Sequence, residues 1–211
     1  MTLSNILVGK ALAVLLSAIL SNAACAMEPK TAMNKSTSLT QAYVWYDGDR
    51  EQQVWLNPQV VAEFNPSPQG ERAVQGVSSS AKIVSTQHQQ AGVRFWRLEN
   101  TTATATRSIS ANHPQGKYSA VMHDAPTSTG RMRALPGNII VYLNPQWDAT
   151  EVKNWLDTRK LTVVKKLEIG PNIYVIKTGP GMEALTTANT LYRSGEVKAA
   201  FPDWWQEVAP R

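Results

Sequence analysis

Cysteine is almost absent from this sequence of 211 residues: the only one, Cys25, lies in an amino-terminal stretch with the features of a secretory signal. That stretch, residues 1–26, has one cation at Lys10, an apolar run over 11–20 and small residues up to Ala26. The run is too short to span a bilayer as a permanent helix. A lipoprotein signal ending at Cys25 is an alternative, which Asn22 disfavours because that position is usually aliphatic. We therefore expect a periplasmic or secreted chain, cleaved near Ala26, free of the membrane and without disulfides.

Motifs for catalysis and metal binding are also missing. The three histidines, His88, His113 and His123, lie in segments expected to be loops or weakly structured, and none has a partner at metal-ligand spacing. His123-Asp124 adjoins several serines, but no nucleophile-elbow sequence presents a serine to it. A glycine-rich phosphate loop is absent as well. We expect no metal ion, no cofactor and no enzymatic activity; an enzyme of unrecognised type is a remote alternative.

Dense runs of charge of one sign are lacking. The chain has 21 basic and 16 acidic residues and a formal net charge of +5, with the two signs interspersed. This distribution is typical of a solvated surface and differs from the clustered cations of a nucleic-acid interface. We expect no nucleic-acid partner.

The amino-terminal half is predicted to be a small β-rich region over 41–125, after a flexible polar lead-in over 27–40. Aromatic and β-branched residues flank an Asp-Gly turn and predict a hairpin over 43–56. The second strand of the hairpin is expected to end at Asn57-Pro58. Further strands are predicted at 92–98 and 118–122.

The segments between these strands are less clearly patterned. Residues 65–91 are rich in Pro, Ser, Gln and Gly, which predicts a polar loop or linker with one short strand at 81–84. Residues 101–112 are weakly specified. The three tryptophans of this half, Trp45, Trp55 and Trp96, are expected in the core, with an extra contact patch as the alternative.

The carboxy-terminal part has a much clearer pattern. After a linker over 126–136, strand and helix periodicities follow in the order β-α-β-β-α-β. The first helix begins at Asp148, where Glu151 completes a capping box, and Gly181 opens the second. The strands are expected at 137–143, 161–167, 173–177 and 197–201. The chain is therefore predicted to be α+β, with a ferredoxin-like domain over 137–203.

In such a domain both helices pack on one face of the sheet and leave the other face open. If Ile139 and Val141 face the helices, Ile140 and Tyr142 project from the open face, and Tyr174 or its neighbours should join them. Exposed apolar side chains of this kind favour a docking surface for another protein. The alternative is that the amino-terminal half covers this face.

RNA-recognition domains of the same topology need several aromatic residues on the central strands, and metal chaperones need paired cysteines; this sequence has neither. Its strand segments instead resemble the propeptide, or inhibitor, domain of subtilisin-like serine proteases. The resemblance lies in the motifs at 138–143, 161–167, 172–176 and 197–203. The stretches 131–137 and 202–208 further resemble the stand-alone external chaperones, of the Aeromonas type, made with secreted subtilisin- or kexin-like proteases.

The resemblance implies a protein that helps a subtilisin-like protease to fold and then stays bound as its inhibitor, as a 1:1 heterodimer. It implies that the open sheet face packs on two protease helices. Asp203 matches the acidic position that in the family caps a protease helix N-terminus. Phe201 stands where propeptides often carry Glu.

The last residues, 204–211, are expected to form a tail after the domain. The resemblance implies that this tail enters the protease cleft like a cleaved product, with Arg211 next to the scissile position. The predicted contact residues of the tail are Trp204, Trp205, Val208, Ala209, Pro210 and Arg211. Alternatively, the two tryptophans fold back on the domain as an apolar lid. For the whole chain, the alternative function is a periplasmic protein-binding module with no protease partner.

Overall fold

The computed structural model describes residues 37–84, 92–99 and 103–207, all within one compact unit over 34–211. The predicted signal peptide, most of the lead-in and residues 208–211 lie outside the described residues. The end of the predicted lead-in is ordered: Leu39 is buried, and its backbone N–H donates to Pro126 O at 2.9 Å. The ordered chain therefore begins earlier than residue 41.

The described chain is a mixed α/β structure with four helices and two antiparallel sheets. None of these helices is long and apolar enough to cross a membrane. The helices are α1 (Pro68–Val77), α2 (Ala103–Asn112), α3 (Ala149–Thr158) and α4 (Met182–Arg193). The strands of the larger sheet are β1 (Ala42–Asp47), β2 (Arg50–Phe64), β3 (Lys82–Ile83), β4 (Val93–Arg97), β5 (Lys117–His123), β6 (Met132–Ala134) and β11 (Trp205–Gln206). Those of the smaller sheet are β7 (Ile139–Tyr142), β8 (Val163–Lys166), β9 (Ile173–Ile176) and β10 (Ala199–Pro202).

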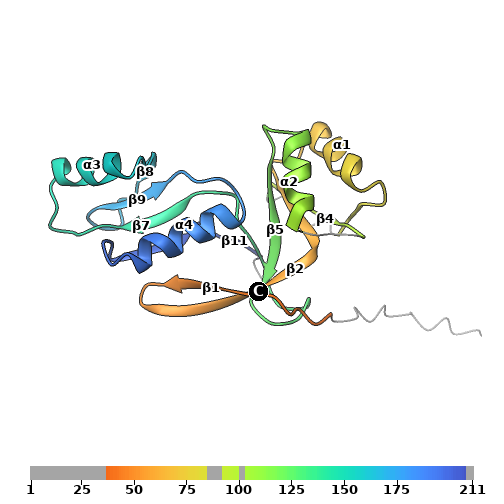
Figure 1. Ribbon diagram of the computed structural model, residues 1–211, viewed down its shortest axis with the longest axis horizontal. Helices are drawn as coiled ribbons and strands as arrows, with labels where there is room; N and C mark the ends of the chain where they lie inside the picture. The colour runs from red at the N-terminus through yellow and green to blue at the C-terminus, as the bar shows by residue number, and fades with distance from the viewer. Residues whose placement is uncertain (1–36, 85–91, 100–102, 208–211) are drawn as a thin grey trace, which may run out of the picture. The chain divides into compact units, whose positions relative to one another are not determined.

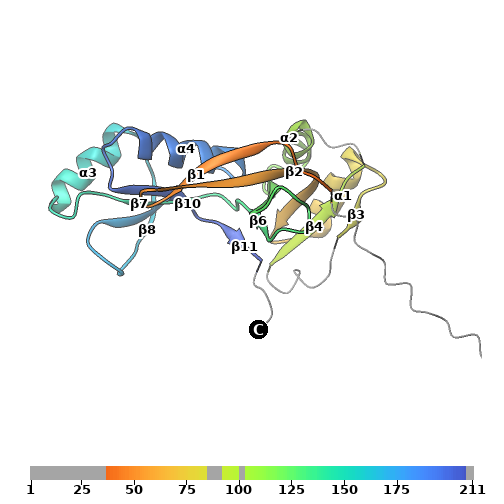
Figure 2. The same cartoon turned by 90° about the horizontal axis from the view of Figure 1, so that it is seen from below.

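The larger sheet has the strand order β11-β6-β5-β2-β4-β3, and β1 pairs with β2 as the predicted hairpin (Figure 2). The prediction that β2 ends at Asn57-Pro58 was wrong. The strand continues to Phe64 through an irregularity between Asn57 and Val61, where its register against β5 shifts. A bulge tolerates a proline because the ladder hydrogen bonds are locally interrupted there.

The two segments with little strand pattern each form a helix. The polar stretch predicted as a loop contains α1, whose N-cap Ser67 accepts a hydrogen bond from Gly70 N at 3.0 Å. The weakly specified stretch contains α2. Buried side chains of both helices pack with Val61, Trp96 and Tyr118 on one face of the sheet. The helices therefore cover that face and leave the other for a separate apolar cluster.

The larger sheet is curled, and its opposite face encloses a separate apolar cluster. Val60, Phe64, Phe95 and Val121 are buried there. The rings of Phe95 and Trp205 lie with centroids 5.0 Å apart, although β4 and β11 are separated in the sheet by β2, β5 and β6. Only a strongly curled sheet brings the side chains of such distant strands into contact.

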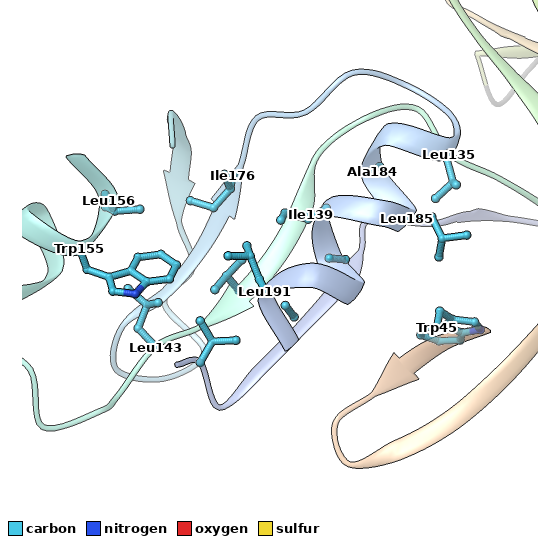
Figure 3. Packing of buried hydrophobic residues seen from close by; sticks show 14 of the residues in the cluster. Trp45, Leu135, Ile139, Leu143, Trp155, Leu156, Ile176, Ala184, Leu185 and Leu191 are labelled. Carbon is cyan, nitrogen blue, oxygen red and sulfur yellow. The ribbon is translucent and has the colours of Figure 1, made fainter. Parts of the chain in front are cut away.

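The smaller sheet has the strand order β10-β7-β9-β8, with α3 after β7 and α4 after β9 (Figures 1 and 2). The predicted β-α-β-β-α-β order of elements is present. Asp148 and Glu151 form the capping box that starts α3. Both helices bury their apolar residues against Ile139, Val141 and Ile176, as Figure 3 shows for Trp155, Leu156, Leu185 and Leu191. One face of the sheet is thereby covered by helices.

Candidate docking face and the segment that follows it

The register of the smaller sheet determines which side chains face the helices. Val141 on β7 lies opposite Tyr174 on β9, and Ile139 lies opposite Ile176. Directly opposed residues share a face, so Tyr174 points toward the helices. It packs as a half-buried ring against their apolar cluster. Of the two options expected, Tyr174 or its neighbours, Tyr174 does not lie on the open face, and its neighbours Ile173 and Val175 do.

The face opposite the helices is apolar. Ile140 pairs with Val175 and with Phe201, and Tyr142 pairs with Ile173, so these five side chains share it. Ala199, opposite Tyr142, lies on the same face, and Lys165, opposite Val175, places a cation on it. Ile140, Tyr142 and Phe201 are half-buried, whereas Ile173 and Val175 are buried. The rings of Tyr142 and Phe201 lie 5.8 Å apart between centroids. We call these five residues the open face.

The hairpin of β1 and β2 packs on the helical side of the smaller sheet. Asn189 on α4 donates a hydrogen bond of 2.8 Å to Val44 O, and the Tyr46 ring stacks on Tyr192 at 4.2 Å. Trp45 joins the apolar cluster under α4, as Figure 3 shows. Of the open face, only Phe201 packs against one of the three apolar clusters of the described residues. That cluster also contains Trp45 and Val54, so the contacts bring the amino-terminal half to Phe201 at one edge of this face and not to Ile140 or Tyr142.

Asp203 follows β10, and its side chain is half-buried. Its backbone N–H donates to Asn138 O at 3.3 Å, which fixes the chain at the end of the sheet. Burial raises the pKa of the Asp203 carboxyl, and the Lys165 ammonium only partly opposes this. A carboxylate with few compensating partners is suited to accept hydrogen bonds from a bound protein.

The tryptophans that follow Asp203 contact the described chain and are half-buried. The Trp204 ring lies edge-on to Trp45 at 5.7 Å, and Trp205 belongs to β11, which pairs with β6. This arrangement matches the alternative in which the tryptophans fold back. The strand that pairs with β11 is β6, so the stretch 126–136, predicted as a linker, contains a strand of the larger sheet. Val208, Ala209, Pro210 and Arg211 lie outside the described residues.

Arg133 on β6 was not singled out from the sequence, although it lies at the junction of the two sheets. Its guanidinium carbon is 5.6 Å from the Trp45 ring and 5.9 Å from the Trp204 ring. Burial lowers the pKa of Arg133 from its ordinary value. Nothing in the stretch Arg131-Met132-Arg133-Ala134 predicts such a position for Arg133; the pairing of β6 with β11 brings it there.

The histidines in the described chain are less exposed than their sequence context predicts. His123, expected in a loop, is the last residue of β5 and only 2% exposed. His113 follows α2, where its Nδ1 lies 2.8 Å from the Tyr118 hydroxyl. His88 lies outside the described residues. Over 37–84, 92–99 and 103–207, no group of three His, Cys, Asp or Glu residues is placed to hold a metal ion.

Comparison with known proteins gave no relative: no family model matches the chain, and no curated protein or solved structure matches it significantly.

Proposed function

We propose that this protein is an external chaperone and inhibitor of a subtilisin- or kexin-like serine protease, which it binds as a 1:1 complex. The observation that carries the proposal is the smaller sheet, with the strand order β10-β7-β9-β8, two helices on one face and an apolar open face. We assign this unit to the ferredoxin-like folds. Propeptide-type inhibitors have this fold, and the strand sequences resemble theirs.

The open face is the proposed docking surface. Ile140, Tyr142 and Phe201 are half-buried and adjacent, so a partner can remove further apolar area from water without rearrangement of the sheet. Aromatic side chains such as Tyr142 are frequent anchors in protein interfaces. In the proposed complex this face lies against two helices of the protease.

Asp203 borders that surface and is the second proposed contact. Its carboxylate is half-buried, and burial raises its pKa, so hydrogen bonds from a protease helix N-terminus would stabilise the charged form. Phe201 occupies the position where propeptides often carry a second acid. We assign Phe201 an apolar contact with the protease in place of a helix cap.

The proposed role of the tail is narrower than the sequence alone suggested. Trp204 and Trp205 pack on the protein itself, so we assign them to holding the tail and leave the cleft contacts to residues 208–211. The main chain of these residues is proposed to pair with the edges of the protease cleft, with Arg211 in the pocket beside the scissile position. A protease that cuts after basic residues is the partner that suits Arg211.

Secretion is part of the same proposal. The stretch 1–26 is proposed to be a signal peptide, which takes the chain to the periplasm or the medium, where secreted proteases mature.

The test is inhibition of an active subtilisin-type protease, together with recovery of activity when the denatured protease refolds beside the mature chain. A chain ending at Glu207 keeps β11 and is the matched control for the tail. We expect the full chain to inhibit and to raise the refolding yield, and the shortened chain and the Arg211→Glu variant to inhibit more weakly. No inhibition and no gain in yield with a panel of kexin-like and subtilisin-like enzymes would contradict the proposal and favour a docking module for another protein.

A further inference from the structure

A cavity of about 580 Å³ opens at one end of the curled inner face of the larger sheet. Residues on β3 and β4 line one side, and Met132 on β6 and Glu207 after β11 line the other. These residues come from the two ends of the strand order. Pockets of this size, in the mouths of curled or closed sheets, commonly hold small ligands.

Two cations stand opposite each other at this cavity. Lys82 on β3 pairs directly with Arg97 on β4, and both exposed side chains line the cavity. Within the described residues no carboxylate lies within ion-pair distance of either one. Like charges directly opposite each other destabilise a strand pair. Arrangements that lower the stability of the fold are found mainly at functional sites, so this pair of cations favours a binding site for an anion.

Apolar side chains line the cavity next to the two cations. Val60 is buried beside Arg97, its direct partner on β2. Val84, which bonds through its N–H to Phe95 O, is 36% exposed, and Met132 is half-buried on the far side. Because the Glu207 carboxylate also lines the cavity, an anionic end fits only beside Lys82 and Arg97, with the apolar body of the ligand against the apolar side chains.

His123 holds two polar groups at the rim of the cavity in place, the side chain of Asn57 and the backbone of Gly130. Gly130 O only accepts, so His123 Nδ1, 2.7 Å away, carries the proton and donates to it. The other ring nitrogen then accepts from Asn57 Nδ2 at 3.1 Å, and Asn57 Oδ1 accepts from Gln59 N at 3.1 Å. Because His123 is 2% exposed and uses both nitrogens, it holds Asn57 and Gly130 at the cavity. A rim held in this way is preorganised for a ligand.

We infer that this cavity binds a small organic carboxylate with an apolar body, whose anionic group is held by Lys82 and Arg97. A short peptide with a free carboxylate and a simple apolar acid share this chemistry. The site lies on the larger sheet, and of its lining residues only Glu207 belongs to the tail, ahead of residues 208–211 that are assigned to the protease cleft. The inference does not use any proposed protease contact.

The test is titration of the full-length mature chain by heteronuclear NMR with three probes: acetyl-alanyl-leucine, its carboxy-terminal amide and decanoate. We expect at least one of the two acids to shift the amide signals of β3 and β4, and the peptide amide to bind far more weakly. Binding of the peptide alone, or of decanoate alone, identifies which source of the carboxylate the cavity prefers. Failure of both acids at millimolar concentration, or measurable binding of the amide as tight as that of the peptide acid, would overturn the inference.

Two substitutions complete the test. Lys82→Gln and Arg97→Gln should each weaken binding of the acid about tenfold, the ratio for a lost charge-assisted hydrogen bond. Each should also raise the melting temperature of the free protein, because it relieves the repulsion between the two cations. Lys117→Gln, an exposed position on β5 away from the cavity, is the control and should change neither property. Unchanged binding in both cavity variants would also refute the assignment.

Discussion

The carboxylate of Glu63 and the guanidinium of Arg94 form a buried ion pair, with Arg94 Nε 2.9 Å from Glu63 Oε2. The same carboxylate accepts hydrogen bonds from Trp96 Nε1 at 2.8 Å and from Ser67 N at 3.1 Å. The pair therefore connects β2, β4 and the start of α1. Burial and the nearby Glu63 charge together raise the pKa of Tyr118 to about 12.

Loss of the Glu63 charge should lower the stability of the protein. Glu63→Gln leaves the Arg94 cation buried without its main counterion, so we expect the free energy of unfolding to fall by about 3 kcal/mol in urea denaturation. Glu71→Gln is the matched control. Glu71 also pairs with Arg94, at 3.3 Å, but its side chain is 43% exposed, so its loss should cost less than about 1 kcal/mol. Equal losses in the two variants would contradict this account.

Two glycines in α1 should respond in opposite directions to alanine. A Cβ on Gly70 would lie 1.8 Å from Glu63 Oε1, so Gly70→Ala should destabilise the protein by about 1–3 kcal/mol. A Cβ on Gly76 would meet nothing closer than 3.7 Å, so Gly76→Ala should stabilise it by up to about 1 kcal/mol. Thermal unfolding measures both. Stabilisation by Gly70→Ala would show that α1 is not packed on the Glu63 carboxylate.

Trp205 should contribute to stability through its contact with Phe95. We expect Trp205→Ala to lower the free energy of unfolding by somewhat less than the roughly 3–5 kcal/mol of a fully buried aromatic residue, because Trp205 is half-buried. Gln206→Ala, an exposed neighbour on the same strand, is the control. An unchanged unfolding curve for Trp205→Ala would mean that β11 is not held on the sheet.

Asp203 should affect stability and protease binding in opposite directions. Its pKa is raised in the folded state, so the folded protein holds this proton more tightly, and stability falls as pH rises above the unfolded value of about 3.9. Asp203→Asn removes that loss and should raise the melting temperature at pH 7 but not at pH 3. The same variant should inhibit the proposed protease less strongly. Asp157→Asn, at an exposed residue of α3, should change neither inhibition nor the pH dependence.

The carboxy-terminal elements could be predicted because local signals and burial agree there. Asp148 and Glu151 cap α3, and the apolar positions of α4 fall on one helical face. The position of Tyr174 could not be predicted, because the register between β7 and β9 decides which face it shares. A shift of one residue reverses every side chain of a strand.

The amino-terminal half was harder to predict because its local signals conflict with its tertiary packing. Ser67-Pro68 is a sound helix start, but the Pro, Ser, Gln and Gly around it resemble a loop. β2 passes through Pro58 because β5 and β4 hold it on both sides. Contacts between distant segments, such as Phe95 with Trp205, have no sequence pattern at all.

The inhibition constant of open-face variants tests the central claim most directly. Tyr142→Glu and Ile140→Glu place a charge on the proposed docking surface, and Ile169→Glu places the same charge at a side chain that is 74% exposed elsewhere. Thermal unfolding first verifies that each variant is folded. The inhibition constant of each variant is then compared with that of the wild type, against a subtilisin-like protease that the wild type inhibits. The account predicts that at least one folded open-face variant loses about a hundredfold in affinity, the ratio for roughly 3 kcal/mol, while Ile169→Glu keeps the wild-type value. Wild-type inhibition by folded open-face variants would contradict it.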